Sequence, residues 1–116
     1  MVQSRNDIAQ LALRRIGFVA SEQAPAGYEQ DQAEDGVTRA HGELAHHGIA
    51  FWPVDETPDD IAGPFAQYVA GEIAGIFLGP DKAQPHEAQM GVALRRMTAV
   101  AGRRDYSDRA VYFEDF

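Results

Sequence analysis

The chain has 116 residues, 10 basic and 18 acidic side chains, a formal net charge of −8 and no cysteine. This length allows one domain with a single hydrophobic core, and the absence of cysteine excludes a disulfide framework and any cysteine-ligated metal site. The acidic balance disfavours broad, tight binding of nucleic acid, because the chain as a whole repels phosphates.

The sequence shows no secretory signal and no membrane-spanning segment. Residues 1–6 lack a basic stretch followed by an apolar run. The most apolar stretch, residues 65–78, carries Glu72 and is shorter than the roughly 20 residues that a membrane span needs. We therefore expect a core helix there, no membrane partner, and assembly in a cytoplasm.

Helical periodicity predicts two helices in the first part of the chain. Ser4 and Asp7 are typical of an N-cap and N3 pair, and they precede a predicted helix over about 5–16. After a connecting segment, a second helix is expected over about 28–47, with a narrow stripe of apolar, mostly small residues: Ala33, Val37, Ala40 and Leu44. Small side chains let helix axes approach closely, so we expect this helix to pack tightly against a neighbour.

A short aromatic segment follows the second helix. Phe51 and Trp52 lie beside Pro53, and the segment is too brief to form a sheet by itself. We interpret Phe51 and Trp52 as a plug at one end of a helix bundle or as a contact between subunits.

Thr57 and Pro58 predict the start of a third helix, as its N-cap and first helical residue. Gly63 and Pro64 then predict a kink or break, since proline lacks the backbone donor and clashes with the preceding turn. The longer piece, over about 64–78, has an apolar face made of Phe65, Val69, Ile73, Ile76 and Phe77, and it ends at Gly79 and Pro80.

A fourth helix is expected to start between residues 81 and 85 and to run to about Ala101, where Gly102 closes it. Arg95 and Arg96 face outward in this prediction. The inward side chains are Met90, Ala93, Leu94, Met97 and Val100. The fold class is therefore all-α: a small bundle of about four to five helices over residues 1–102, with an extended C-terminal arm over residues 103–116.

The C-terminal arm is rich in aromatic residues and alternating charges, and it has no helical period that would bury its rings on the same domain. Terminal segments are commonly disordered, but this composition is not that of a solvating tail. We interpret the arm as a docking segment for a partner protein. Its candidate partner-binding residues are Arg103, Arg104, Tyr106, Arg109, Val111, Tyr112, Phe113 and Phe116.

Charge is distributed unevenly along the chain. Residues 21–81 hold nearly all the excess acid, whereas residues 82–104 hold five basic side chains against a lone glutamate, Glu87. This asymmetry is typical of a subunit that presents an acidic surface in one direction and docks through a basic one.

No constellation in the sequence indicates catalysis or a cofactor. Glu43 and His46 form one E-x-x-H step, but a di-iron bundle needs that step twice. His46 and His47 end a predicted helix, where imidazoles interact favourably with the dipole. The serines have no strained elbow around them, and adjacent carboxylates diverge around a helix. We therefore expect a protein that is not an enzyme and binds no metal or cofactor.

Several short segments resemble the head-to-tail connector proteins of tailed bacteriophages. This family of adaptor or head-completion proteins includes packaged-DNA stabilisation proteins and the adaptors of gene transfer agents. The resemblance covers about residues 4–101 and rests on ALRRIG at 12–17, HG at 47–48, FW at 51–52, TPDDIA at 57–62 and YVAGEIA at 68–74.

The resemblance implies a structural virion protein at the head-tail interface. Members assemble as a ring, commonly of twelve copies, beneath the portal protein after DNA packaging. The ring extends the DNA channel, helps to retain packaged DNA without tight specific binding, and receives the next neck or tail protein, a stopper or tail terminator. The C-terminal segment commonly reaches toward the portal, which would give the aromatic arm its partner.

A second hypothesis stays open. The chain could be a small cytoplasmic helical regulator with a partner-binding C-terminal arm, and such a regulator could bind DNA. A helix-turn-helix reader normally exposes basic or amide side chains on its second helix, whereas the centre of this chain is acidic.

Overall fold

The structure is a computed structural model that describes the backbone of residues 2–18 and 27–114 and the side chains of residues 2–18 and 27–102. The described chain is all-α, as predicted, and its only sheet is a short two-stranded bridge. Its elements are β1 (Val2–Gln3), α1 (Arg5–Arg15), α2 (Gly27–His46), β2 (Thr57–Pro58), α3 (Asp59–Leu78) and α4 (Pro80–Glu114).

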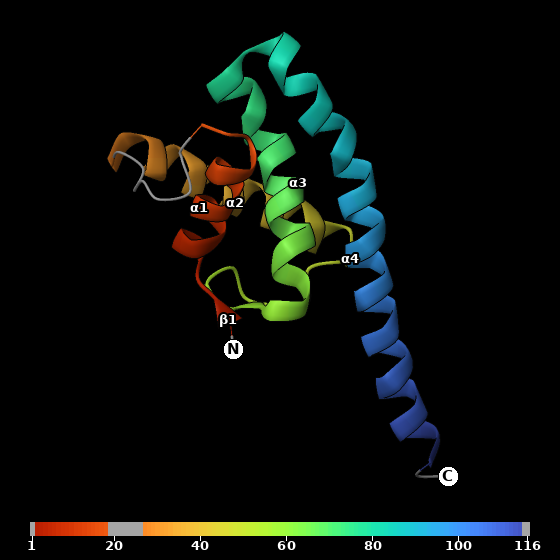
Figure 1. The fold of residues 1–116 in the computed structure, drawn as a ribbon. Coiled ribbons are helices and arrows are strands. Elements are labelled where there is room, and N and C mark those ends of the chain that lie inside the picture. The colour runs from red at the N-terminus through yellow and green to blue at the C-terminus, as the bar shows by residue number, and fades with distance from the viewer. Residues whose placement is uncertain (1, 19–26, 115–116) are drawn as a thin grey trace.

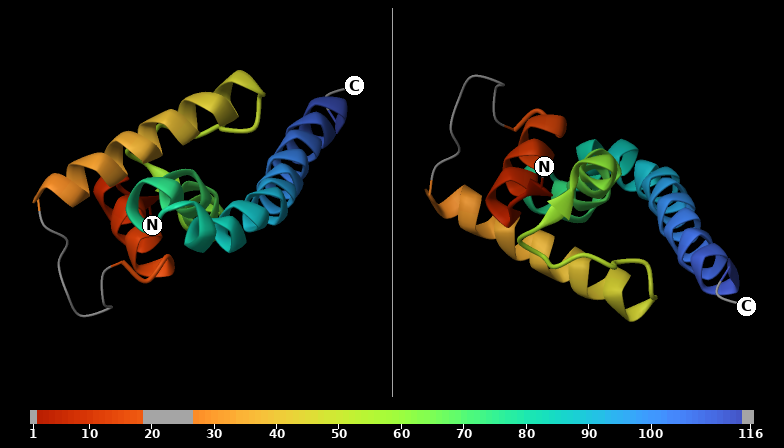
Figure 2. Two further views of the ribbon diagram at one scale, coloured as in Figure 1. Left: turned by 90° about the horizontal axis from the view of Figure 1, so that it is seen from above. Right: turned by 90° about the horizontal axis from the view of Figure 1, so that it is seen from below.

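Helix α3 lies at the centre of the fold. It packs against α1 and α2 on one side and against α4 on the other (Figure 2). α4 runs antiparallel to α3 and continues past the N-terminal end of α3 (Figure 1). The two-residue strands pair antiparallel, Val2 with Pro58 and Gln3 with Thr57, and so tie the start of the chain to the start of α3.

The first helix begins as its sequence predicts. The Ser4 hydroxyl accepts a hydrogen bond from the Asp7 backbone N–H at 3.1 Å, and the Asp7 carboxylate accepts one from the Ser4 N–H at 3.1 Å. This reciprocal capping box satisfies two donors that a helix N-terminus otherwise leaves unpaired. The local signal therefore fixes the first helical residue without help from the rest of the fold.

The stripe on α2 packs closely, as predicted. Ala33, Val37 and Ala40 are fully buried. Between them, Gly36 lies so near α3 that a Cβ at this position would overlap the Ile73 side chain. The close packing of α2 on α3 thus depends on the lack of a side chain at Gly36 as well as on the small alanine side chains beside it.

The predicted capping role of Thr57 is wrong. α3 begins at Asp59, its N-cap residue is Pro58, and no side chain caps it. Thr57 instead pairs with Gln3 in the β-bridge and is fully buried, and its hydroxyl has no hydrogen-bond partner among the described residues. The bridge shifts the helix start by one residue and turns a capping signal into a core position.

Of the predicted kink or break at Gly63 and Pro64, the break is absent, because α3 is one helix from Asp59 to Leu78 with Pro64 inside it. Pro64 removes one ladder hydrogen bond early in the helix, and its ring is buried. Packing on three other helices outweighs that loss. Of the predicted apolar face, Phe65, Val69 and Ile73 are fully buried and Phe77 is half-buried, but Ile76 is 53% exposed.

By length and composition α3 is apolar enough to cross a membrane, yet 61% of its most apolar window is buried inside the fold. Burial of this extent against α1, α2 and α4 is the arrangement of a core helix. Gly79 ends the helix with a positive φ of 81°, at the predicted position.

Helix α4 is longer than predicted at both ends. It starts at Pro80, carries Pro85 inside its early turns, and does not stop at Gly102 but continues to Glu114. Gly102 is not among the glycines with positive φ, so it sits in the helix, where glycine is only about 1 kcal/mol worse than alanine. Ala93 and Met97 are fully buried and Arg95 and Arg96 are exposed, as predicted.

Candidate partner-binding surfaces

Trp52 and Phe51 occupy different environments in the connection between α2 and β2. Trp52 is 4% exposed and its ring packs against Phe65 of α3 at a centroid distance of 5.3 Å. Phe51 contacts Trp52 at 5.0 Å but is 40% exposed. Trp52 therefore belongs to the core of this chain, and Phe51 is the member of the pair that a neighbouring protein can reach.

His41 fixes the backbone of this aromatic segment. Its Nε2 lies 2.6 Å from the backbone carbonyl oxygen of Trp52, a hydrogen bond that requires the proton on Nε2. The imidazole also meets the Trp52 ring edge to face at 5.9 Å. The Trp52 indole N–H is buried without a partner among the described residues. His41 is thus a structural residue that holds the connection onto α2.

Glu43 of the E-x-x-H step takes part in a contact between α2 and α3. Within residues 2–18 and 27–102, no group of three or more His, Asp or Glu side chains could hold a metal ion. Glu43 instead accepts a hydrogen bond from the Tyr68 hydroxyl of α3 at 3.1 Å. Burial, together with the Glu43 contact, raises the pKa of Tyr68 to about 12. The phenol therefore stays protonated and keeps donating at any ordinary pH.

Glu72 lies near the same contact between α2 and α3. Burial raises the pKa of its carboxyl group, the negative charge of Glu43 raises that pKa further, and Arg39 opposes the shift. Glu72 is therefore one of the charged groups, with Glu43 and Arg39, at the contact between α2 and α3.

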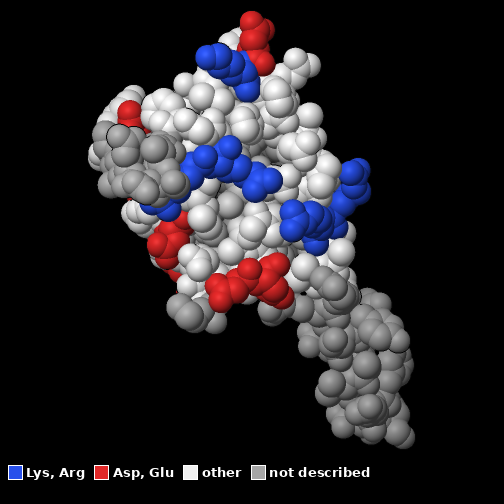
Figure 3. All heavy atoms as spheres, viewed as in Figure 1, with Lys and Arg blue, Asp and Glu red and all other residues white. Residues whose placement is uncertain are grey.

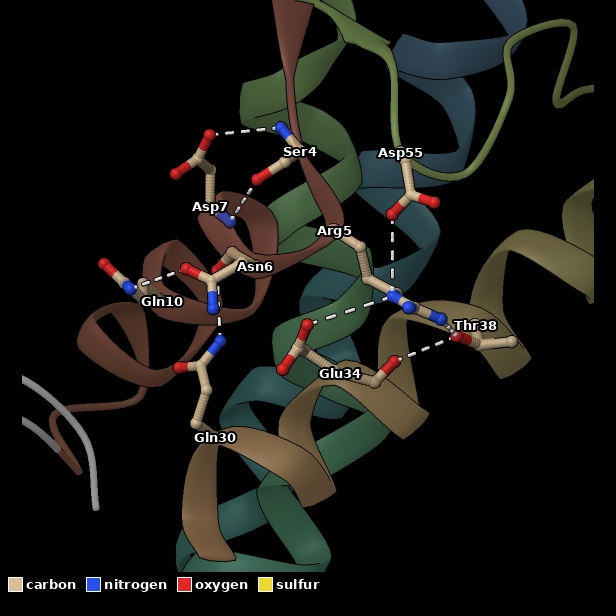
Figure 4. A network of polar contacts seen from close by, with 9 residues as sticks. All are labelled: Ser4, Arg5, Asn6, Asp7, Gln10, Gln30, Glu34, Thr38 and Asp55. Carbon is tan, nitrogen blue, oxygen red and sulfur yellow. Dashed lines mark hydrogen bonds and ion pairs between the residues drawn. The ribbon is translucent and has the colours of Figure 1, made fainter. Parts of the chain in front are cut away.

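A polar network around Arg5 connects the N-terminal part of the chain to the rest of the fold (Figure 4). The Arg5 guanidinium donates to the Thr38 hydroxyl at 3.2 Å, and its Nε lies 3.9 Å from Glu34 and 3.6 Å from Asp55. The network joins α1, α2 and the connection before β2. Its partners are far from Arg5 in the sequence, so no local pattern indicates it.

A hollow of about 240 Å³ lies between the N-terminal turns of α3 and the middle of α4. It is lined by Asp60, Pro64, Arg96, Ala99 and Val100. Gln67 of α3 is 4% exposed and holds Arg96 in place, because its amide oxygen accepts from the guanidinium at 3.2 Å while its amide nitrogen donates to Gln89. The hollow is open, and its lining combines three apolar residues with one acidic and one basic side chain.

Helix α2 exposes an acidic outer side. Asp31 and Asp35 are exposed and form no ion pair among the described residues. Tyr28, on the same side of the helix, is 73% exposed, more than any other large apolar side chain in the described chain. Its hydroxyl accepts a hydrogen bond from Gln32 at 2.9 Å, which restrains the ring. Tyr28 is not among the site residues predicted from the sequence, although an aromatic residue one and two helical turns before two acidic residues is a signal that the sequence contains.

On the face shown in Figure 3, basic side chains lie along α4, across the middle and at the top, and acidic side chains lie toward the lower and left edges and at the top. Both signs of charge are therefore present on this face, and the part of it over α4 is basic. Such a surface favours an oriented approach of a charged partner.

The candidate docking residues of the C-terminal arm fall outside the described side chains. Residues 103–114 continue α4 as backbone, and Phe116 lies outside the described residues. Their contribution to partner binding stays a prediction.

Scans against protein-family models, curated proteins and solved structures find no match to this chain. The resemblance to head-to-tail connectors therefore rests on the sequence segments named above and stays a prediction.

Proposed function

We propose that this protein is a structural, non-enzymatic subunit of a ring at the head-tail junction of a tailed-phage or gene-transfer-agent particle. In this proposal the ring sits beneath the portal, extends the DNA channel, helps to retain packaged DNA, and receives the stopper or tail terminator on its other side. DNA passes through without tight specific binding.

The observation that carries the proposal is the placement of α4. This helix docks on α3 and then runs past the body, so the aromatic C-terminal segment lies beyond the end of the core helix (Figure 1). Apolar residues placed there can be buried on a second protein, and each Å² of apolar surface buried stabilises the complex by roughly 25 cal/mol. The ring-forming connectors that the sequence resembles use the same segment toward the portal.

The acidic composition supports the proposal over the regulator hypothesis. A net charge of −8 repels DNA phosphates, which suits a channel that DNA must cross and opposes counterion-driven binding. The exposed side of α2 carries Asp31 and Asp35 in place of the basic residues that a DNA-reading helix presents.

The test is the mass of the purified protein, alone and mixed with a portal ring from the same genome, measured by native mass spectrometry. A complex containing several copies of this chain per portal ring is expected. A stable dimer that does not bind the portal, and that retards a DNA duplex in a gel mobility-shift assay at physiological salt, would establish the regulator hypothesis instead.

A further inference from the structure

Two exposed faces of the molecule differ in charge and lie on opposite sides. The acidic face consists of Tyr28, Asp31 and Asp35 on α2. The basic face consists of Arg95 and Arg96 on α4, beside the hollow between α3 and α4, which Asp60 also lines. The N-terminal end of α2 and the helix α4 lie on opposite sides of α3 in both views of Figure 2. One copy cannot bring its own two faces together.

We propose that a second copy of this chain occupies the basic face: the acidic face of one subunit docks head-to-tail onto the basic face of the next, with Tyr28 inserted into the hollow. This inference rests on the proposed function in that it names the subunit contact of the ring.

The hollow suits an aromatic ring. An apolar cavity of about 150 Å³ is large enough to hold benzene, and this hollow measures about 240 Å³. Pro64, Ala99 and Val100 supply apolar walls, and the Arg96 guanidinium can lie against the face of an inserted ring. Tyr28 is the most exposed aromatic side chain of the described residues, at 73%, and a hydrogen bond from Gln32 restrains its ring.

The charges around this contact match. Asp31 and Asp35 follow Tyr28 by about one and two turns of α2, and neither has an ion-pair partner among the described residues. Arg95 on α4 is also exposed and unpaired within that part of the chain. Docking would place two carboxylates near two guanidinium groups, which fixes the orientation of the subunits more than it adds affinity.

The position of the faces selects the symmetry of assembly. A two-fold contact needs one self-complementary patch, and here each patch would meet its own charge. A head-to-tail contact pairs opposite charges and uses both faces of every copy. Such a contact gives a ring when the rotation between subunits closes and an open chain when it does not.

Crosslinking tests the contact directly. The natural chain has no cysteine, so a Gln32→Cys, Thr98→Cys double variant carries the only two thiols and keeps both Tyr28 and the lining of the hollow. With a short bis-maleimide, the double variant has two thiols per chain and should give a ladder of crosslinked multimers. An equimolar mixture of the two single variants has one thiol per chain and should give mainly a crosslinked dimer. The control pair His47→Cys with Lys82→Cys, at two exposed positions outside the proposed contact, should give neither the ladder of multimers nor the dimer. Failure of the double variant to form more than the control pair would overturn the inference.

Charge reversal gives a second, independent test. Asp31→Arg with Asp35→Arg makes both faces basic, and Arg95→Asp with Arg96→Asp makes both faces acidic. Each variant alone should associate about tenfold more weakly than the wild type in sedimentation at low salt, whereas the mixture should recover wild-type association through alternating subunits. The single variant Arg95→Asp keeps the hydrogen bond from Arg96 to Gln67. If the double variant Arg95→Asp with Arg96→Asp unfolds, this single variant should still associate more weakly than the wild type.

The outcomes separate this inference from the function proposed above. A wild-type protein that stays monomeric at every concentration, or variants that associate as the wild type does, would contradict the head-to-tail contact. Portal association of the wild type is measured separately and can succeed in either case, and its failure with intact self-association would contradict the connector function alone.

Discussion

Thr57 is a buried residue whose hydroxyl has no hydrogen-bond partner among the described residues. An unpaired buried hydroxyl destabilises a fold by about 1–3 kcal/mol, so replacing it with a methyl group of similar size removes a penalty. We expect Thr57→Val to raise the free energy of unfolding by about 1 kcal/mol in thermal or urea unfolding.

Thr57→Ser is the matched control for this prediction, because it keeps the hydroxyl and removes the methyl group. It should destabilise the protein by about 1 kcal/mol through lost packing. A destabilising Thr57→Val would mean that a water molecule pairs the hydroxyl in solution.

Glu72 predicts a pH dependence of stability. Burial and Glu43 raise the pKa of Glu72 above its ordinary value of 4.5, so the folded state holds the proton more tightly than the unfolded chain does. The stability that this group contributes is fully present below pH 4.5 and is lost as the pH rises through the raised folded-state pKa.

Glu72→Gln, which is neutral at every pH, should therefore be more stable than the wild type at pH 7, and the difference should shrink as the pH falls toward 4.5. Glu56→Gln controls for the loss of one negative charge, since Glu56 is exposed. Equal stabilisation by both variants would show that net charge, and not the environment of Glu72, is responsible.

At the scale of the elements, the contact between α3 and α4 depends on Gly71. A Cβ on this residue would overlap the Met90 side chain and lie 2.9 Å from the backbone carbonyl oxygen of His86, which cannot move without shifting α4. We expect Gly71→Ala to lower the free energy of unfolding by about 1–3 kcal/mol.

Gly75 gives the matched control one turn further along α3. It is exposed, and a Cβ there would meet only a Glu87 carboxylate oxygen at 3.8 Å. Gly75→Ala should raise stability by about 0.5–1 kcal/mol, because alanine is the better helix former. If both substitutions have the same sign in urea unfolding, α4 does not pack on α3 as closely as described.

At the scale of the whole molecule, removal of residues 105–116 separates folding from partner binding. The core formed by the described side chains runs from Ile8 to Met97. The removed segment has no helical period that would bury its rings on the same domain. We therefore expect the truncated protein to unfold at nearly the same temperature and to lose helicity only in proportion to the residues removed. Each ring that a portal would bury contributes on the order of 2 kcal/mol, so portal association should fall by orders of magnitude.

Thermal unfolding and portal association of the truncated chain are measured side by side. Lost cooperativity would show that the segment belongs to the core of the domain. Unchanged portal binding would remove the C-terminal segment from the proposed interface.

Local signals in the sequence determined the helical class of the fold and most of the helix boundaries. Ser4 with Asp7 fixed the start of α1, Gly79 fixed the end of α3, and the spacing of apolar residues placed the stripe of α2 in the core. These features depend on hydrogen bonds and dihedral angles within a few residues, or on a period that a single helix imposes, so neighbouring sequence contains the information.

Tertiary structure decided the features that join distant residues. The β-bridge moved Thr57 from a cap into the core, packing on three helices carried α3 through Pro64, and Gly102 stayed helical in α4. The Arg5 network and the hollow beside Arg96 join residues that are about 30 or more positions apart. Their energies depend on which surfaces meet when the helices pack, and the periodicity of one helix does not specify its neighbour.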